Sequence, residues 1–251
     1  MRDLFSRAAG FASMQKQRRV GNAQMNSPVF AFDAYGTLFD VHAAIEHQRH
    51  AIGPDARQLS ETWRNKQLEY TWTLTLAGRY VDFWTVTVRA LDQALARFPT
   101  VDAGLRNRLL ESYMTLDAFP DARKTLNDLK KRGLRTAILS NGSPSMLTAA
   151  VESAQLADSL DEVLSADAVH LYKPHPDVYR LATDAFGVAP SEIVFVSSNR
   201  WDIMGAAVFG FRTVWLNRDE RPDEYVDLAP SVVLTNLAGV AALEALARQA
   251  R

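Results

Sequence analysis

The stretch VFAFDAYGTLFD, residues 29–40, decides the fold class of this 251-residue chain. Residues 29–32 are all apolar, which is typical of a strand buried on both faces, and Asp33 follows them directly. Similar apolar runs recur as TAIL from Thr136, IVFVSS from Ile193, TVWL from Thr213 and SVVL from Ser231. Segments with helical periodicity begin at Asp121, Pro144 and Pro176. Because strands alternate with helices, the sequence predicts an α/β protein with a Rossmann-like parallel sheet.

The interval between the first two predicted strands is too long for a single crossover. The first strand ends near Phe32 and the next begins near Arg135, whereas one helical crossover needs only about a dozen residues or slightly more. Residues 42–119 are rich in helix formers and aromatics, with apolar residues three and four apart. We therefore expect a core domain formed by residues 28–41 and 120–251, with residues 42–119 inserted as a helical cap domain.

Residues 1–27 differ in composition from the rest of the chain. They carry five Lys and Arg residues against one acid, and they lack the apolar core of a secretory signal. We expect an N-terminal extension without ordered structure, or an upstream start with Met25 as the true initiator; a transit-like segment is the less favoured alternative. The role of the extension stays open.

Composition narrows the possible partners. Hydrophobic residues make up 47% of the chain, but no apolar run approaches the roughly 18 residues that a membrane helix needs. The net charge of -1 favours neither nucleic acid nor an anionic membrane surface, so we expect a small-molecule partner. The absence of cysteine fits a reducing, cytoplasmic location and leaves oxygen and nitrogen groups to carry any chemistry.

Polar residues follow the predicted strands at the points where the strands end. In parallel sheets, ligands bind beyond the carboxyl ends of the strands, so these residues are candidates by position. They are Asp33 after the first strand, Ser140 and Asn141 after the second, and Ser197, Ser198, Asn199 and Asp202 after IVFV. Taken singly, each of them could instead cap a helix. Their common position favours a shared site.

Four separated motifs, in order, resemble the haloacid dehalogenase superfamily. They are FDAYGTLFD at 32–40, SNG at 140–142, KP at 173–174 and SSNRWD at 197–202. Two further segments, WRNKQLEYTW at 63–72 and GRYVDFW at 78–84, resemble its L-2-haloacid dehalogenase subgroup. The resemblance extends from Val29 to about Asn217. It implies hydrolysis of (S)-2-haloalkanoic acids to (R)-2-hydroxyalkanoic acids through an aspartyl ester, with no metal or other cofactor, in an enzyme that could be a homodimer.

Two departures separate the chain from the magnesium-dependent phosphatases of the same superfamily. Tyr35 stands where those enzymes place a second aspartate to protonate a leaving alkoxide, and a halide needs no proton. The string SSNRWD offers Asp202 as its one acid, whereas Mg²⁺ requires several oxygen ligands. A magnesium-dependent phosphohydrolase, a dehalogenase that prefers haloacetate or fluoroacetate, and a non-catalytic binding protein remain as alternatives.

The resemblance implies a role for each catalytic candidate. Asp33 is the nucleophile, Lys173 is the cation that keeps it charged, and Thr37, placed in a helical turn, orients it. Three further residues orient the hydrolytic water and Lys173; they are Ser197, Asn199 and Asp202. Which group activates the water stays open.

The same resemblance implies the substrate-binding residues. Arg64, Asn141 and the edge of Trp201 form a halide cradle, while Ser140 helps to hold the substrate carboxylate. An apolar wall surrounds the alkyl group; its members are Tyr35, Leu68, Phe83 and Trp201. Tyr179 belongs to the polar shell. No metal site is assigned, and the preferred halogen and chain length stay open.

Other aromatic and imidazole side chains receive no catalytic role. We expect Trp63, Trp72 and Trp84 to be buried by helix packing, since aromatics at helical spacing usually face a core. His170 and His175 lack the spacing of metal ligands, so we expect them in loops.

Overall fold

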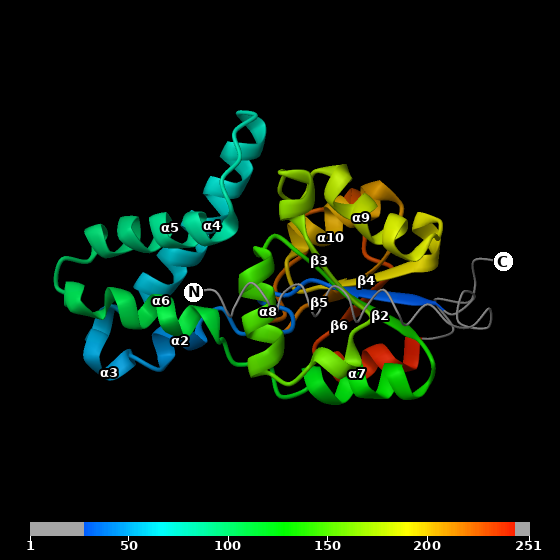
Figure 1. Ribbon diagram of the computed structural model, residues 1–251, viewed down its shortest axis with the longest axis horizontal. Coiled ribbons are helices and arrows are strands. Elements are labelled where there is room, and N and C mark those ends of the chain that lie inside the picture. Colours follow the sequence, from blue (N-terminus) through cyan, green and yellow to red (C-terminus); the bar gives the residue numbers. More distant parts are fainter. Residues whose placement is uncertain (1–27, 244–251) are drawn as a thin grey trace, which may run out of the picture.

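The computed structural model describes residues 28–243, so the predictions for residues 1–27 lie outside the described part of the chain. Its sheet has six parallel strands in the order β3-β2-β1-β4-β5-β6 (Figure 1). The strands are β1 Val29–Phe32, β2 Arg135–Ser140, β3 Glu162–Ser165, β4 Ile193–Ser197, β5 Arg212–Leu216 and β6 Val232–Leu234. The predicted α/β fold with a Rossmann-like parallel sheet is confirmed.

The sheet centres on β1, which pairs with β2 on one side and β4 on the other. All four residues of β1 are fully buried, as its unbroken apolar run predicts. The pairing with β4 continues one residue past the strand, because the Asp33 N–H donates to the Val196 carbonyl at 2.9 Å. Asp33 is thereby fixed at the carboxyl end of the central strand.

One strand was not predicted from the sequence. Glu162–Ser165 forms β3 at the edge of the sheet, and each of its four residues is only half-buried. Because the segment begins with an acid and lacks an apolar run, it carries no signal of a buried strand.

Helices cover both faces of the sheet, with α9 and α10 on one side and α7 on the other (Figure 1). The core helices are α7 Ala122–Lys131, α8 Pro144–Ser153, α9 Pro176–Phe186 and α10 Arg200–Phe209. Helix α9 shows how sequence sets their ends. Pro176 occupies its first turn, and Gly187 closes it with a left-handed φ of 64°.

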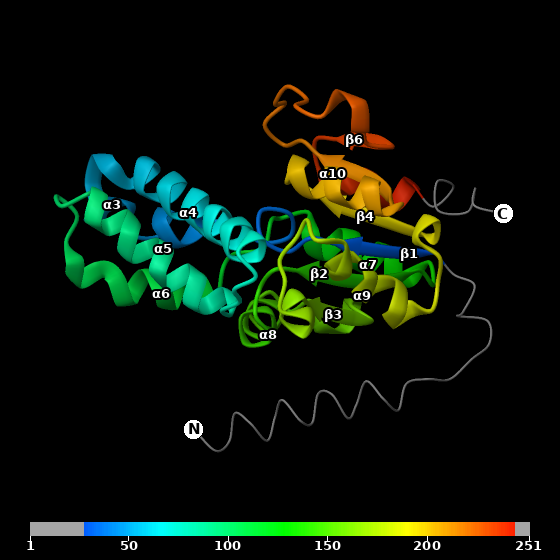
Figure 2. The same cartoon turned by 90° about the horizontal axis from the view of Figure 1, so that it is seen from above.

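The long insertion forms a separate group of helices beside the sheet (Figure 2). They are α2 Ala43–Glu46, α3 Arg49–Ile52, α4 Ala56–Leu76, α5 Phe83–Arg97 and α6 Arg106–Met114. Trp63 links three of them, donating from Nε1 to the Thr87 carbonyl at 3.0 Å and packing 4.9 Å from the Tyr113 ring. All five helices lie between residues 42 and 119, and we call them the cap. That these residues form a domain with those bounds stays a prediction.

The chain enters and leaves the cap at one place. The Asp40 N–H donates to the Asp117 carbonyl at 2.8 Å, and the Phe119 N–H donates to the Leu38 carbonyl at 2.9 Å. Short 3-10 segments complete the described chain; they are η2 Gly53–Asp55, η3 Ala103–Leu105, η4 Ala157–Ser159, η5 Ala166–Val169, η6 Pro190–Glu192, η7 Val226–Leu228 and η8 Leu237–Leu243. Between residues 28 and 243, no helix has the length and apolar character to span a membrane.

Candidate active site

Asp33 lies at the base of the site and is 6% exposed. Its Oδ2 accepts hydrogen bonds from Thr37 Oγ1 at 3.1 Å and from Asn199 Nδ2 at 2.8 Å. Its Oδ1 faces Lys173 Nζ at 3.1 Å. Donors on both oxygens fix the orientation of the carboxyl group.

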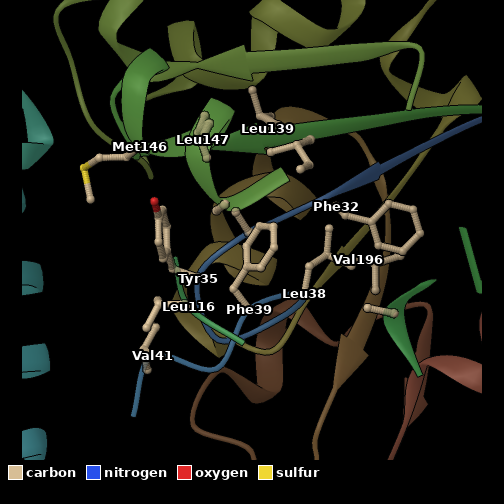
Figure 3. Close-up of a cluster of buried hydrophobic side chains, with 14 of the residues drawn as sticks. Phe32, Tyr35, Leu38, Phe39, Val41, Leu116, Leu139, Met146, Leu147 and Val196 are labelled. Carbon is tan, nitrogen blue, oxygen red and sulfur yellow. The ribbon is translucent and has the colours of Figure 1, made fainter. Parts of the chain in front are cut away.

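A tight turn after β1 holds these partners in place. The amides of residues 37–39 all donate to the Ala34 carbonyl, and Gly36 adopts a φ of 94° that a residue with a side chain would rarely take. Ser198 fastens the turn to β4 by donating from Oγ to the Gly36 carbonyl at 2.7 Å. Thr37 therefore lies in a turn, and its predicted helical turn is wrong. The turn packs onto the buried cluster in Figure 3.

Lys173 is completely buried between two carboxylates. Its Nζ lies 3.1 Å from Asp33 Oδ1 and 2.9 Å from Asp202 Oδ2, and 4.7 Å from the centroid of the Phe195 ring. Its backbone N–H donates to Asn141 Oδ1 at 2.9 Å. A buried ammonium group is tolerated only when it is paired, and here the pairing places it beside Asp33.

Asp202 is the second carboxylate and is also fully buried. Its Oδ2 accepts from Ser197 Oγ at 3.1 Å as well as from Lys173, and its Oδ1 accepts from the Tyr179 hydroxyl at 2.8 Å. Burial raises the pKa of Asp202 to about 6, while the charge of Lys173 acts in the opposite direction. The pair of carboxylates thus shares one cation, so the group carries a net negative charge when both are ionised.

The cap closes the site with aromatic rings around Tyr35. The Tyr35 ring lies 5.8 Å from the Phe83 ring at the start of α5 and 5.8 Å from the stacked Tyr113 ring of α6. Arg64 Nη2 on α4 donates to the Tyr35 carbonyl at 3.2 Å. Sequence reasoning missed Tyr113; the one signal was its place on the apolar face of the helical segment LLESYM.

A cavity of about 420 Å³ opens beside Lys173. Trp72 of α4 and Trp201 of α10 border it, with the two rings edge to face at 5.5 Å. Trp72 is 37% exposed, so its predicted burial within the helical packing is wrong. Trp63 is buried as predicted, and Trp84 is half-buried. Trp72 differs because the end of α4 reaches the core, where its ring meets Trp201.

Hydrogen bonds bring most of the predicted polar residues into one network. Its members are Asp33, Thr37, Asn141, Lys173, Tyr179, Ser197, Asn199 and Asp202. Ser140 is buried beside the network, where its Oγ accepts from the Gly142 N–H at 3.1 Å. Leu68 is half-buried on α4. The roles assigned to all of these residues stay predictions.

The two histidines lie at the ends of short elements. His170 terminates η5 with a left-handed φ of 55°, and His175 caps α9 by accepting from the Asp177 N–H at 3.3 Å. Both positions agree with the predicted loops.

A buried lysine thus lies beside the aspartate that follows the central strand, and a helical insertion separates the first two strands. The model of the haloacid dehalogenase-like hydrolase family matches residues 28–210, and the chain belongs to this family.

Individual relatives narrow the similarity. (S)-2-haloacid dehalogenase 1 of Pseudomonas sp. (strain CBS-3) is 52% identical over 77% of this chain and 86% of that protein. Haloacetate dehalogenase H-2 of Moraxella sp. (strain B) is 40% identical over 75% of this chain and 84% of that protein. The structure of L-2-haloacid dehalogenase from Xanthobacter autotrophicus, with chloropropionic acid covalently bound, superposes with a TM-score of 0.79 at 37% identity, covering 86% of this chain and 98% of that one. The predicted membership of the L-2-haloacid dehalogenase subgroup is confirmed.

The polar groups around Asp33 do not fit the magnesium ion of the phosphatases in this superfamily. Asp202 is the one acid of SSNRWD, and its oxygens already accept from Lys173, Ser197 and Tyr179. Among residues 28–243, no group of three or more His, Asp or Glu side chains is arranged to hold a metal ion.

Proposed function

We propose that this chain hydrolyses (S)-2-haloalkanoic acids to (R)-2-hydroxyalkanoic acids through an ester formed on Asp33. The observation that carries the proposal is the buried Lys173 ammonium, 3.1 Å from Asp33 Oδ1, in a site where Tyr35 takes the place of a general acid. Such a site supplies a carboxyl nucleophile and lacks the second aspartate that would protonate a leaving group. The similarity to (S)-2-haloacid dehalogenase 1 supports the same reaction.

In the first step, an Asp33 oxygen attacks the halogen-bearing carbon from the side opposite the halogen. The new C–O bond forms as the C–halogen bond breaks, and the halide leaves with the bonding electrons, so the configuration inverts. Thr37 and Asn199 hold the other carboxylate oxygen. The Arg64 guanidinium, with Asn141 and the edge of Trp201, would receive the halide.

In the second step, water attacks the carboxyl carbon of the Asp33 ester. The bond between that carbon and the ester oxygen breaks, and Asp33 regains its carboxylate with one oxygen from water. One proton of the water goes to the departing alkoxide, which leaves as the hydroxy acid, and the other is released to solvent. The carbonyl oxygen of the ester is Oδ2, so the Thr37 hydroxyl and the Asn199 amide, which donate to it, would stabilise the negative charge that develops there. Lys173 faces the ester oxygen, Oδ1. Ser197, Asn199 and Asp202 would orient the water and Lys173.

The cap would select the substrate by its alkyl group. Phe83 and Tyr35 face each other at 5.8 Å, and with Leu68 and Trp201 they would form an apolar wall around the chain of the acid. Ser140 would contribute to binding of the carboxylate.

A second candidate is a preference for haloacetate, and it rests on the similarity to haloacetate dehalogenase H-2. The chemistry on Asp33 would be unchanged, while a tighter wall would exclude longer acids. A magnesium-dependent phosphohydrolase is disfavoured because Tyr35 stands where those enzymes place a second aspartate, and because SSNRWD offers Asp202 as its one acid.

The decisive experiment measures halide release in EDTA from (S)-2-chloropropanoate, (R)-2-chloropropanoate, chloroacetate and fluoroacetate. We expect chloride from the (S) form, (R)-lactate as product, and none from the (R) form. In a single turnover in H₂¹⁸O with enzyme in excess, the hydroxyl oxygen of lactate should be ¹⁶O, since it comes from Asp33. Labelled lactate in that first turnover would rule out the ester. Activity only on phosphate esters with Mg²⁺ would establish the alternative.

Two further expectations, on location and oligomeric state, accompany the proposal. We propose a cytoplasmic enzyme, supported by the lack of cysteine in the sequence, and a homodimer, supported by the resemblance to the subgroup. Fractionation of cells and light scattering of the purified protein test them; a membrane-bound fraction or a mass of 27.9 kDa would contradict them.

A further inference from the structure

The loop between α4 and α5 is fastened to the core by polar contacts. The Tyr80 hydroxyl donates to Asp167 Oδ1 at 2.5 Å. The Tyr172 hydroxyl donates to the Val81 carbonyl at 2.5 Å, and the Tyr172 N–H donates to Thr75 Oγ1 at 3.2 Å. Three hydrogen bonds therefore join the cap to one short stretch of the core.

Stacked rings strengthen the same contact. The Tyr80 ring lies 4.9 Å from the His170 ring and 5.3 Å from the Tyr172 ring. Burial, with the hydrogen bond to Asp167, raises the pKa of Tyr80, so its hydroxyl keeps its proton and remains a donor. A neutral donor on a carboxylate is a charge-assisted hydrogen bond, the stronger kind. We call the group of Tyr80, Asp167 and Tyr172 the cap latch.

On the core side, the latch is continuous with the segment that carries Lys173. Tyr172 precedes Lys173 in the chain, and the Asp167 N–H donates to Ser165 Oγ at 3.1 Å. Ser165 in turn donates to the Gly142 carbonyl at 2.6 Å, next to the residue that holds the Lys173 amide. The core half of the latch is thus a fixed part of the site.

On the cap side, the latch controls the position of the apolar wall. Phe83 follows Tyr80 by three residues and begins α5, and its ring contacts Tyr172 at 6.2 Å and Tyr35 at 5.8 Å. If the loop moved away from Asp167, the first turn of α5 would move with it. The wall, rather than the nucleophile, would lose its support.

We propose that Tyr80 is a positioning residue for substrate binding, which acts through Asp167 to hold Phe83 over the site. This inference rests on the proposed dehalogenase function. The Lys173 ammonium is held separately by Asp33 and Asp202, so release of the latch leaves the reacting groups in place. Loss of the latch therefore raises KM and leaves kcat nearly unchanged.

The kinetic test is Tyr80→Phe, which removes the hydroxyl and keeps the ring stack. We expect KM for (S)-2-chloropropanoate to rise about three- to tenfold with kcat within about twofold, as for loss of one hydrogen bond. Tyr70→Phe is the matched control, because Tyr70 lies on α4 with its ring near Lys66 rather than Asp167. An unchanged KM in Tyr80→Phe would overturn the proposal, as would an equal rise in the control.

The partner is tested by a pair of substitutions. Asp167→Asn keeps an oxygen that can accept from Tyr80 but removes the charge, so its KM should rise less than that of Asp167→Ala. Asp167→Ala should match Tyr80→Phe, and the double variant Tyr80→Phe/Asp167→Ala should be no worse than either single variant, since both remove one contact. Additive increases in KM would show independent effects and reject the latch.

Hydrogen exchange separates the latch from the activity. In Tyr80→Phe, amides of residues 77–82 and of Tyr172 should exchange faster, while Tyr70→Phe should match the wild type. If the wild type releases no halide, the proposed function fails, and this measurement still tests the contact. If the wild type is active and exchange is unaltered in Tyr80→Phe, the latch itself is refuted.

Discussion

The core side and the cap side of the site consist of different kinds of side chain. The core side consists of buried charges, where Lys173 Nζ lies 3.1 Å from Asp33 Oδ1 and 2.9 Å from Asp202 Oδ2. The cap side consists mainly of rings, with Phe83 and Tyr113 each 5.8 Å from the Tyr35 ring. Hydrogen bonds between charged groups fix the positions of individual atoms, whereas packed rings fix the shape of the space beside them. Changes on the core side should therefore stop the chemistry, and changes on the cap side should alter which substrate binds.

The largest expected effect is that of Asp33→Asn. A neutral amide is a poor nucleophile, so turnover should fall at least about 10³-fold, while the amide oxygen can still accept from Lys173 and preserve the fold. Halide release and thermal unfolding measure the two quantities. Asp128→Asn, an ion-pair partner of Lys124 on α7, is the matched control and should keep full activity. A variant of Asp33 with most of its activity would refute the covalent mechanism.

Asp202→Asn separates activity from stability. Its activity should drop by about 10²-fold, since Lys173 loses one of its two anchors. The raised pKa means that folded Asp202 binds a proton between pH 3.8 and about 6 that the unfolded chain has released, so ionised Asp202 costs stability at higher pH.

Relative to this variant, the wild type should therefore lose up to about 3 kcal/mol of unfolding free energy between pH 4 and 7. Urea unfolding at several pH values measures the difference. A wild type that gains stability over the variant as pH rises would contradict the proposed cost of the buried charge.

On the cap side, Phe83→Leu should change selectivity more than chemistry. The smaller side chain leaves space beside Tyr35, so kcat/KM for 2-chloropropanoate should fall about fivefold, with a smaller loss for 2-chlorohexanoate. Phe98→Leu, at the other end of α5, controls for lost packing. Equal losses on both acids would place Phe83 outside the wall.

The smallest expected effect is a shift in pH dependence in Tyr179→Phe. The Tyr179 hydroxyl lowers the pKa of Asp202 by donating to it, so its removal should raise that pKa. Activity should decline as the pH falls through about 6 and Asp202 becomes protonated; in the variant, the decline should begin up to about one pH unit higher. Profiles of kcat/KM against pH measure it, and a shift to lower pH would contradict the assignment.

The same contrast explains what the sequence could predict. Apolar runs located β1, β2, β4, β5 and β6, and parallel topology then required the polar residues that follow them to meet at one edge. Motifs named the residues of the core network, because that chemistry needs fixed residue types.

Contacts of the cap carry no comparable signal. Trp72 was expected inside the helical packing and instead meets Trp201, and Tyr113 was not singled out at all. Tyr80 and Asp167 are 87 residues apart in the sequence, and neither residue type predicts a contact with the other. Such contacts depend on how helices pack, which apolar periodicity restricts only to a face.

The adjacent entry and exit of the cap have a consequence for the evolution of this fold. The Asp40 amide and the Asp117 carbonyl lie 2.8 Å apart, so the sheet meets the same two chain ends whatever lies between them. An exchange of everything between these residues would preserve strand order and register. Evolution can therefore exchange the cap, which contacts the substrate's alkyl group in the proposed reaction, while the sheet and the residues around Asp33 are retained.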